Sequence, residues 1–279
     1  MIGRLVLVST PIGNLGDLSP RAVEALRTAA LICCEDTRRT GRLLQHAGIT
    51  GARLAVANDH TEAARTAQVL DVLAGGGDVA VVTDAGTPGI SDPGWRLATA
   101  VAGAGYEVSA VPGPAALVMA LVVSGLDTTR FVFEGFLPRS GRERAARLAE
   151  VAAERRTSVL YEAPHRIERT VADLAAACGD ERRVVLAREL TKLHEEVWRG
   201  TLAEASAHLA ATPPRGEFVV VLAGVPAVDP DQVTDEQVRE ALRMALADGA
   251  DRRAAIATVV ADLHVPKRRA YDIALTLPR

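Results

Sequence analysis

The sequence predicts an α/β protein with two successive sheets and a short helical extension at the end of the chain. In the first 111 residues, short apolar β-branched runs alternate with longer helical patterns, which is typical of a largely parallel sheet. Beyond residue 131 the apolar runs lie closer together and include candidate hairpins, which indicates a mixed sheet. Beyond residue 235 only helical patterns remain.

The N-terminal region supplies candidate strands separated by candidate helices. Ser19 followed by Pro20 is a typical helix entry, because a capping hydroxyl precedes a proline in the first turn. Strands are expected at 5–9, 31–35, 53–57, 78–83 and 107–111, and helices near 20–30, 37–47, 61–74 and 95–104.

The segment "VPGPAA" at 111–116 interrupts this alternation and predicts a boundary between two α/β domains, 1–114 and 115–225. An apolar helical run, "AALVMALVVSGL", opens the second domain. The Pro- and Asp-containing stretch 225–235 is expected to be a linker, and 236–279 to form an extension of three short helices. Strands of the second domain are expected at 131–136, 157–162, 182–189, 196–200 and 217–224.

Composition excludes several classes of protein. The net charge of −3 gives no global attraction to nucleic acid, so any basic surface must be local. The three cysteines form no CxxC pair, which disfavours a zinc site or a disulfide framework. The apolar run at the N-terminus is too short for a signal segment or a membrane span, so we expect a cytoplasmic protein without a membrane anchor and without a metal.

The loop "TDAGTPGISDPG" at 83–94 directly follows a candidate strand and is the strongest site signal in the first domain. Gly86 and Gly89 allow the backbone to approach a ligand, and two prolines stiffen the loop. Asp84 and Asp92 suit a cationic or hydroxyl-bearing ligand such as S-adenosylmethionine (SAM). The loop at 9–20 also follows a strand but lacks the GxGxxG spacing, and no P-loop motif is present. A purely structural role for either loop stays open at this point.

Charged residues gather at three places in the second domain and at one in the first. "YEAPHR" (161–166) combines a ring, an acid, a histidine and an arginine, and "ARELTKLHEE" (187–196) holds one of only two lysines. "PRSGRERAAR" (138–147) could grip phosphates, and "CEDTRRT" (34–40) could be a site or a helix cap. Each of these segments could equally be a solvated charged surface.

Together these segments resemble one family. "TPIGNLGDLSPRA", "CEDTRRTGRLL", "VTDAGTPGISDPG", "VPGPAA", "FEGFLPR", "LYEAPHRI", "ARELTKLHEE" and "GEFVVVLAG" appear in the order and spacing of the ribosomal RNA small-subunit methyltransferase I family, a branch of the tetrapyrrole-methylase superfamily. The resemblance covers roughly 4–224. It implies a two-domain tetrapyrrole-methylase-like fold, a homodimer, and SAM bound between the domains.

The implied reaction is 2′-O-methylation of a cytidine in the decoding region of 16S rRNA in the 30S subunit. A tetrapyrrole or another small molecule is an alternative substrate on the same fold, and a non-catalytic SAM-sensing or RNA-binding module is a third hypothesis. The helical extension, with Lys267, Arg268 and Arg269, could contact RNA.

Carried over by position, the resemblance implies specific site residues. At 56–65 the chain departs from the family pattern, although His60 and Glu62 remain. Either Glu162 or His165 would act as general base, supported by Arg166, Arg188 or Lys192. The implied cofactor contacts are Pro11, Ile12, Gly13, Asp84, Ala85, Gly86, Ile90, Ala115 and Ala116, with Leu190 and Glu162 of the second domain aligned less securely.

Overall fold

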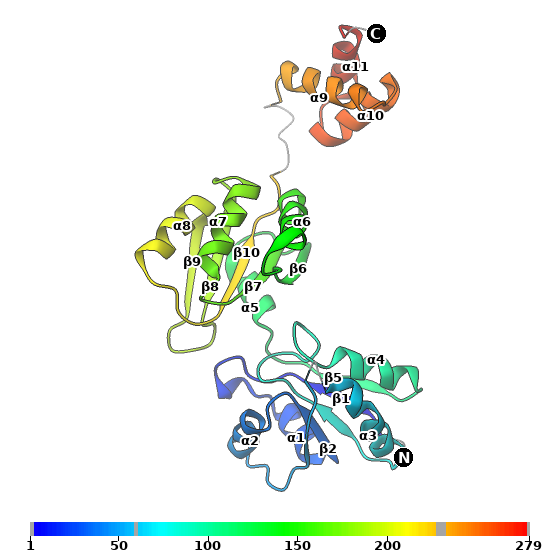
Figure 1. Ribbon diagram of the computed structural model, residues 1–279, viewed down its shortest axis with the longest axis vertical. Coiled ribbons are helices and arrows are strands. Elements are labelled where there is room, and N and C mark those ends of the chain that lie inside the picture. Colours follow the sequence, from blue (N-terminus) through cyan, green and yellow to red (C-terminus); the bar gives the residue numbers. More distant parts are fainter. Residues whose placement is uncertain (1–2, 59–60, 227–232, 278–279) are drawn as a thin grey trace. The chain divides into compact units, whose positions relative to one another are not determined.

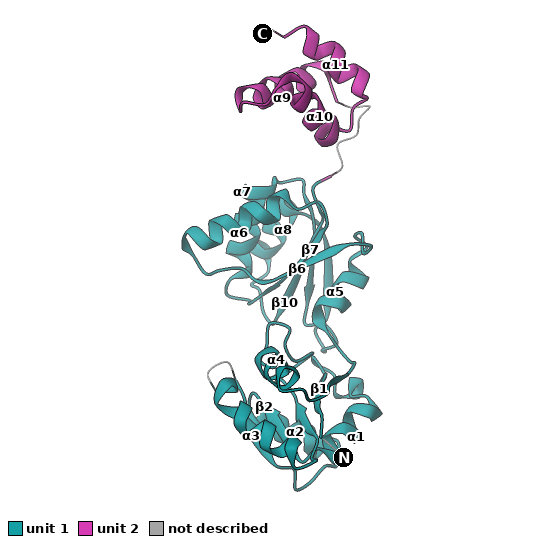
Figure 2. Ribbon diagram, turned by 90° about the vertical axis from the view of Figure 1, so that its right-hand side faces the viewer, with its two compact units in different colours: residues 1–225 teal, residues 226–279 magenta. Residues whose placement is uncertain are grey.

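The computed structural model describes residues 3–58, 61–226 and 233–277. The chain forms two compact units, residues 1–225 and residues 226–279 (Figure 2). We call residues 3–111 the N-terminal lobe and residues 116–225 the C-terminal lobe of the first unit. A domain boundary at 114/115 stays a prediction.

The N-terminal lobe is built on a parallel sheet, as the alternating pattern predicted (Figure 1). Its strands are β1 (Leu5–Val8), β2 (Leu31–Cys34), β3 (Leu54–Val56), β4 (Val79–Val81) and β5 (Val108–Val111), in the order β3-β2-β4-β1-β5. Between them lie the 3-10 helix η1 (Leu15–Asp17) and the helices α1 (Pro20–Thr28), α2 (Thr37–His46), α3 (Glu62–Ala74) and α4 (Trp95–Gly103).

Helices cover both faces of this sheet, and successive strand residues point to opposite faces, so both sets of side chains are buried. The adjacent Cys33 and Cys34 show the alternation directly. Cys33 packs in a core with α3 and α4, whereas Cys34 packs in a core with α1 and α2. Helix α1 begins as expected, with the Ser19 hydroxyl accepting a hydrogen bond from the Ala22 amide at 3.1 Å.

The C-terminal lobe contains the predicted mixed sheet, in the order β6-β7-β10-β8-β9. Strands β6 and β7 are parallel, β10 is antiparallel to β7 and β8, and β8 and β9 form a hairpin. The strands are β6 (Phe131–Phe136), β7 (Thr157–Glu162), β8 (Arg183–Arg188), β9 (Glu196–Thr201) and β10 (Phe218–Leu222).

One face of this sheet packs against α6 (Gly141–Ala153), α7 (Ile167–Cys178) and α8 (Leu202–Ala211), and the other against α5 (Ala116–Ser124). The sequence analysis set no bounds for α6, α7 and α8. No helix within the described parts of the chain combines the length and apolar character needed to cross a membrane.

The second unit consists of short helices around its own apolar core. These are α9 (Asp235–Ala247), α10 (Arg252–Leu263) and α11 (Lys267–Leu275), which agree with the predicted helical extension. Val238, Ile256 and Ile273, one from each helix, are buried together in this core.

Candidate functional site

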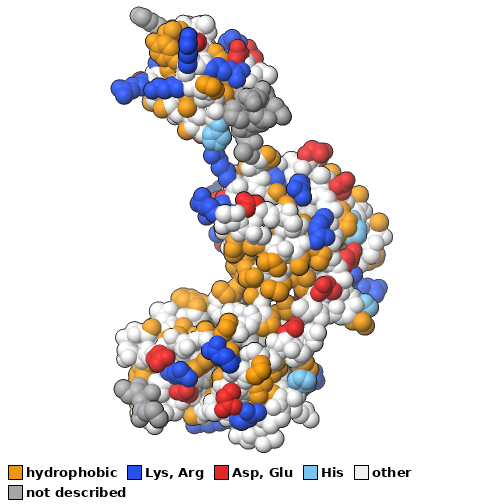
Figure 3. Space-filling view, turned by 180° about the vertical axis from the view of Figure 1, so that it is seen from behind, with side chains coloured by type: hydrophobic (Ala, Val, Ile, Leu, Met, Phe, Trp, Pro, Cys, Tyr) orange, Lys and Arg blue, Asp and Glu red, His pale blue; other side chains and the backbone are white. Residues whose placement is uncertain are grey.

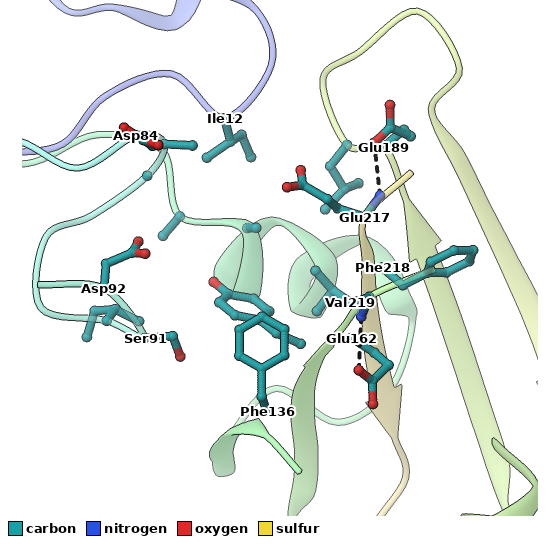
Figure 4. A pocket seen from close by; sticks show the side chains of 18 of the residues that line it. Ile12, Asp84, Ser91, Asp92, Phe136, Glu162, Glu189, Glu217, Phe218 and Val219 are labelled. Atoms are coloured by element: carbon teal, nitrogen blue, oxygen red, sulfur yellow. Dashed lines mark hydrogen bonds between the residues drawn. The ribbon is translucent and has the colours of Figure 1, made fainter. Parts of the chain in front are cut away.

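A cavity of about 520 Å³ lies in the first unit, which is within the usual size range of ligand pockets. Its walls follow the carboxyl ends of β1, β2, β4 and β5 in the N-terminal lobe and of β6, β7 and β8 in the C-terminal lobe. Figure 4 shows Asp84, Ser91 and Asp92 on one side, with Glu189, Glu217 and Phe218 on the other. Ligands of open α/β sheets bind at such strand ends.

Backbone and hydroxyl groups hold the N-terminal wall together. Thr10 and Gly86 exchange amide-to-carbonyl hydrogen bonds of 2.9 and 3.1 Å, which joins the loop after β1 to the loop after β4. The Thr87 hydroxyl lies 3.0 Å from the Ser9 hydroxyl and donates to the Pro114 carbonyl at 3.1 Å. Gly86 has a φ of +83°, which an L side chain rarely adopts. The wall is therefore stiff and presents backbone to the cavity.

Glu62 fixes the far end of the loop 83–94, a role that the sequence analysis missed. Its Oε1 accepts hydrogen bonds from the Gly94 amide at 3.0 Å and the Leu97 amide at 2.9 Å. These donors lie at the start of α4, where Gly94 has no side chain to act as a cap. The distance of 32 residues along the chain between cap and helix start explains why no local pattern revealed it. Asp92 lines the cavity.

Carboxylates outnumber cations in the lining. Asp84 has one oxygen, Oδ1, that is buried without a hydrogen-bond partner within the described structure, while Oδ2 lies 3.4 Å from the Arg39 Nε. Burial raises the pKa of Asp84, the Arg39 charge opposes this, and the Asp36 charge adds to it. The acids of the lining are Glu35, Asp84, Asp92, Glu162, Glu189 and Glu217, and the permanent cations are Arg39 and Lys192.

Aromatic rings form an apolar part of the C-terminal wall. Tyr161 meets Phe133 and Phe136 edge to face, with ring centroids 5.0 and 5.7 Å apart. Its hydroxyl accepts a hydrogen bond from the Leu117 amide in the first turn of α5, at 3.2 Å. Burial raises the pKa of Tyr161, so the phenol is neutral at physiological pH. This residue therefore links β7 to the start of α5.

Glu162 is buried at the end of β7 and its carboxylate is fully engaged. It accepts hydrogen bonds from the Thr170 hydroxyl at 2.6 Å and the Ala163 amide at 2.9 Å, and the Arg166 Nε lies 3.1 Å away. Arg144, only 4% exposed, donates to the same Thr170 hydroxyl at 3.1 Å and pairs with Asp173 at 2.8 Å. This buried network fixes the segment that carries His165.

Lys192 lies between two acids at the opposite end of the same wall. Its Nζ donates to Glu189 Oε1 at 2.7 Å and to Glu217 Oε2 at 2.8 Å. The same Glu189 oxygen also accepts a hydrogen bond from the backbone amide of Glu217 at 3.0 Å (Figure 4). Burial acts to lower the pKa of Lys192, but these hydrogen bonds outweigh it and the pKa is raised. Lys192 therefore stays protonated and supplies positive charge rather than a base.

Most of the residues implied by the resemblance meet at this cavity. Pro11, Gly13, Arg166 and Arg188 do not line it. Gly13 packs against the 190–192 segment, where an added Cβ would lie 2.4 Å from the Lys192 Cγ, and Arg188 pairs with Glu196 at 2.8 Å. His60 lies outside the described residues. Those that line the cavity are Ile12, Asp84, Ala85, Gly86, Ile90, Ala115, Ala116, Leu190, Glu162, His165 and Lys192.

Some lining residues were not predicted as site residues although they lie within the quoted motifs, because nothing in the local pattern distinguished them from their neighbours. Ser91, Phe136, Glu217 and Phe218 are examples. Ser91 has a φ of +59°, and left-handed non-glycine residues cluster at functional sites. No group of three or more His, Cys, Asp or Glu side chains in the described part of the chain is placed to hold a metal ion.

Comparison with known proteins identifies the family. The family model of tetrapyrrole (corrin/porphyrin) methylases matches residues 4–206. A protein of Synechocystis named ribosomal RNA small subunit methyltransferase I is 48% identical over 276 residues, which is 99% of each chain. The protein of that name from Mycobacterium tuberculosis is 48% identical over 223 residues, covering 80% of this chain and 78% of the relative.

Solved structures show the same fold at lower sequence identity. The methyltransferase CobJ superposes with a TM-score of 0.61 at 21% identity, covering 80% of this chain and 95% of that one. Uroporphyrin-III-C-methyltransferase of Thermus thermophilus gives a TM-score of 0.53 at 24% identity, covering 78% and 94%. The chain thus belongs to the tetrapyrrole methylase family and, within it, to the ribosomal RNA small subunit methyltransferase I family, and it is a methyltransferase.

Proposed function

We propose that the protein transfers a methyl group from SAM to the ribose 2′-hydroxyl of a cytidine in the decoding region of 16S rRNA, acting on the 30S subunit in the cytoplasm. The name of its relatives, ribosomal RNA small subunit methyltransferase I, supports ribosomal RNA as the class of substrate. The observation that carries the proposal for this chain is the composite cavity, which combines a stiff backbone wall, an excess of carboxylates and an exposed histidine.

The residues present fit SAM. A ligand with a sulfonium, an ammonium and a ribose diol suits a cavity in which carboxylates exceed cations. Asp84 Oδ1, buried without a partner among the described atoms, is available to a hydroxyl or a positive charge. Ile12, Ala115 and Leu190 offer apolar surface for a nucleobase. When bound, SAM supplies an electrophilic methyl group.

The chain's own residues orient the nucleophile and accept its proton. His165 is exposed, lines the cavity and makes no hydrogen bond or ion pair to another described residue, so a ribose hydroxyl can reach it. We assign it as the general base. Glu162 positions the loop that carries His165, because its carboxylate is already engaged. Lys192, held between Glu189 and Glu217, places positive charge at the other end of the same wall.

The test is methyl transfer from labelled SAM to 30S subunits that lack the modification, with the product nucleotide identified by mass spectrometry. We expect a single 2′-O-methylcytidine. His165→Ala should lower kcat by about 10²- to 10⁴-fold, while leaving the Kd for SAM within a factor of a few. Glu162→Gln should keep the pH dependence of kcat while lowering its magnitude.

The outcomes separate the alternatives. Methylation of a tetrapyrrole and not of 30S subunits would replace the proposed substrate, and absence of any turnover would favour a SAM-sensing module. Loss of the pH dependence in Glu162→Gln, with His165→Ala fully active, would make Glu162 the base.

We also propose that the protein is a homodimer that pairs through α5. This nine-residue helix has no charged side chain, and Val118, Met119, Val122 and Val123 on its outer side are 38–59% exposed. Figure 3 shows hydrophobic side chains gathered over one face of the first unit. A large exposed apolar patch is typical of an interaction site. Light scattering should give twice the chain mass for the wild type and the chain mass for Val122→Asp; a monomeric wild type would reject the dimer.

A further inference from the structure

The segment between β6 and the body of α6 carries arginines of two kinds. Arg144 and Arg147 are paired, to Asp173 and to Glu134 respectively, each at 2.8 Å. Arg139 and Arg142 are exposed and have no ion pair or hydrogen bond to any described residue. Both guanidinium groups are therefore free to contact a ligand.

Two hydrogen bonds fix the backbone immediately before Arg139. The Arg166 Nη2 donates to the Leu137 carbonyl at 2.6 Å, and the Arg144 Nη1 donates to the Pro138 carbonyl at 2.9 Å. Leu137 itself is only 2% exposed. Two consecutive carbonyls are thus fixed by charged donors immediately before Arg139. We call residues 137–142 the anchored arm.

The anchored arm lies beside the cavity. Phe136, the residue before it, lines the cavity at the end of β6. Arg166 ties the arm to the loop after β7, which carries His165 at the cavity edge. Because β6 and β7 are parallel, both loops leave the same edge of the sheet.

The interior of the cavity carries mostly acidic side chains, whereas the anchored arm carries unpaired arginines. The carboxylates of the lining repel phosphate groups, so an RNA substrate can insert a ribose only if its phosphodiesters stay outside. The unpaired guanidiniums of the anchored arm offer a place for them, with Glu143 as the one neighbouring acid of the first turn of α6.

We propose that Arg139 and Arg142 bind backbone phosphates of the rRNA strand next to the methylated nucleotide and so hold its ribose at the cavity. This inference rests on the proposed function and adds the surface that grips the substrate. Contacts of this kind fix register and orientation without reading sequence. They act on binding of the RNA and leave the cofactor untouched.

The test compares two double variants of the full-length protein. Arg139→Ala with Arg142→Ala removes the proposed contacts. Arg155→Ala with Arg183→Ala is the matched control. Both arginines are exposed and have no side-chain partner among the described residues, and they lie at the amino ends of β7 and β8, on the opposite side of the sheet. Equal melting temperatures and circular dichroism would show that both variants fold.

The KM for 30S subunits should rise about tenfold or more in the anchored-arm variant, with kcat and the Kd for SAM within a factor of two of the wild type. The dependence of log(kcat/KM) on log salt should become shallower by about 1.4, or about 0.7 for each lost contact to a single strand. The control should match the wild type in each measurement.

Two failures are distinguishable. If the wild type methylates 30S subunits and the two double variants behave alike, the anchored arm does not bind the substrate and the proposed function stands. If the wild type does not methylate 30S subunits, the proposed function itself fails, whatever the variants do.

Discussion

The two lobes build their sides of the cavity in different ways. The N-terminal lobe uses loops after parallel strands, held by backbone hydrogen bonds, threonine and serine hydroxyls and the remote carboxylate of Glu62. The C-terminal lobe uses charged side chains. They are held by the buried network of Arg144, Thr170 and Glu162 and by the hydrogen bonds of Lys192 to its two acidic neighbours.

This difference suggests a division of labour. A wall of fixed backbone recognises the shape of a ligand, whereas a wall of oriented charges positions reacting groups. We therefore expect damage to the N-terminal wall to weaken cofactor binding, and damage to the C-terminal network to slow turnover and destabilise the fold.

The largest expected loss of stability comes from breaking the buried network of Arg144. Arg144→Ala removes the buried guanidinium that donates to Asp173, Thr170 and the Pro138 carbonyl, so the free energy of unfolding should fall by about 2–4 kcal/mol. Arg147→Ala on the same helix removes an arginine that is 44% exposed and should cost less than about 1 kcal/mol. Urea denaturation measures both; equal losses would contradict a special role for the buried arginine.

The next effect tests the cap on the N-terminal wall. Glu62→Ala removes the acceptor of two amides at the start of α4 and should cost about 1–2 kcal/mol of stability. Because the loop 83–94 is then less fixed, the Kd for SAM should rise about tenfold, measured by calorimetry. Glu62→Gln keeps an acceptor oxygen and should lose much less. An unchanged Kd in both variants would mean that the cap serves stability alone.

A third variant tests the contact between the two walls. Gly13→Ala places a Cβ 2.4 Å from the Lys192 Cγ and 2.9 Å from the Thr191 Oγ1, and relieving this overlap should cost about 1–3 kcal/mol. Gly41→Ala is the control, since no atom lies within 4 Å of its added Cβ and its position in α2 favours alanine. Thermal unfolding and kcat should change for Gly13 only; a fully active Gly13→Ala would show that the walls can shift apart freely.

The smallest effect concerns Asp84. A raised folded-state pKa means that this carboxyl contributes stability below the ordinary aspartate value of about 3.9, and that the contribution is lost as pH rises through the raised value. At neutral pH, Asp84→Asn should therefore raise Tm by a few degrees at most (about 2–4 °C per kcal/mol) and weaken SAM binding. The gain in Tm should shrink as pH falls toward 3.9; a lower Tm at neutral pH would contradict the raised pKa.

The order and type of the strands, of the first-lobe helices and of the helical extension could be predicted from the sequence alone. The strands and first-lobe helices lie within a few residues of their predicted bounds, because apolar alternation, proline, glycine and capping residues act over a few positions. The sequence also located the loops after β1, β4, β7 and β8 that surround the cavity, since glycine, proline and charged residues mark strand ends.

Which charged side chains line the cavity, and which hold its walls in place, could be seen only in the folded structure. Glu162 and Arg166 are neighbours in a motif that resembles a catalytic segment. In the structure, the Glu162 carboxylate is fully hydrogen-bonded within the protein, and Arg166 donates to the Leu137 carbonyl. Glu62 caps a helix 32 residues away, and Arg144 is buried while Arg142 is exposed. These roles depend on partners that are distant along the chain, and the local patterning of a sequence carries no information about which distant groups will meet.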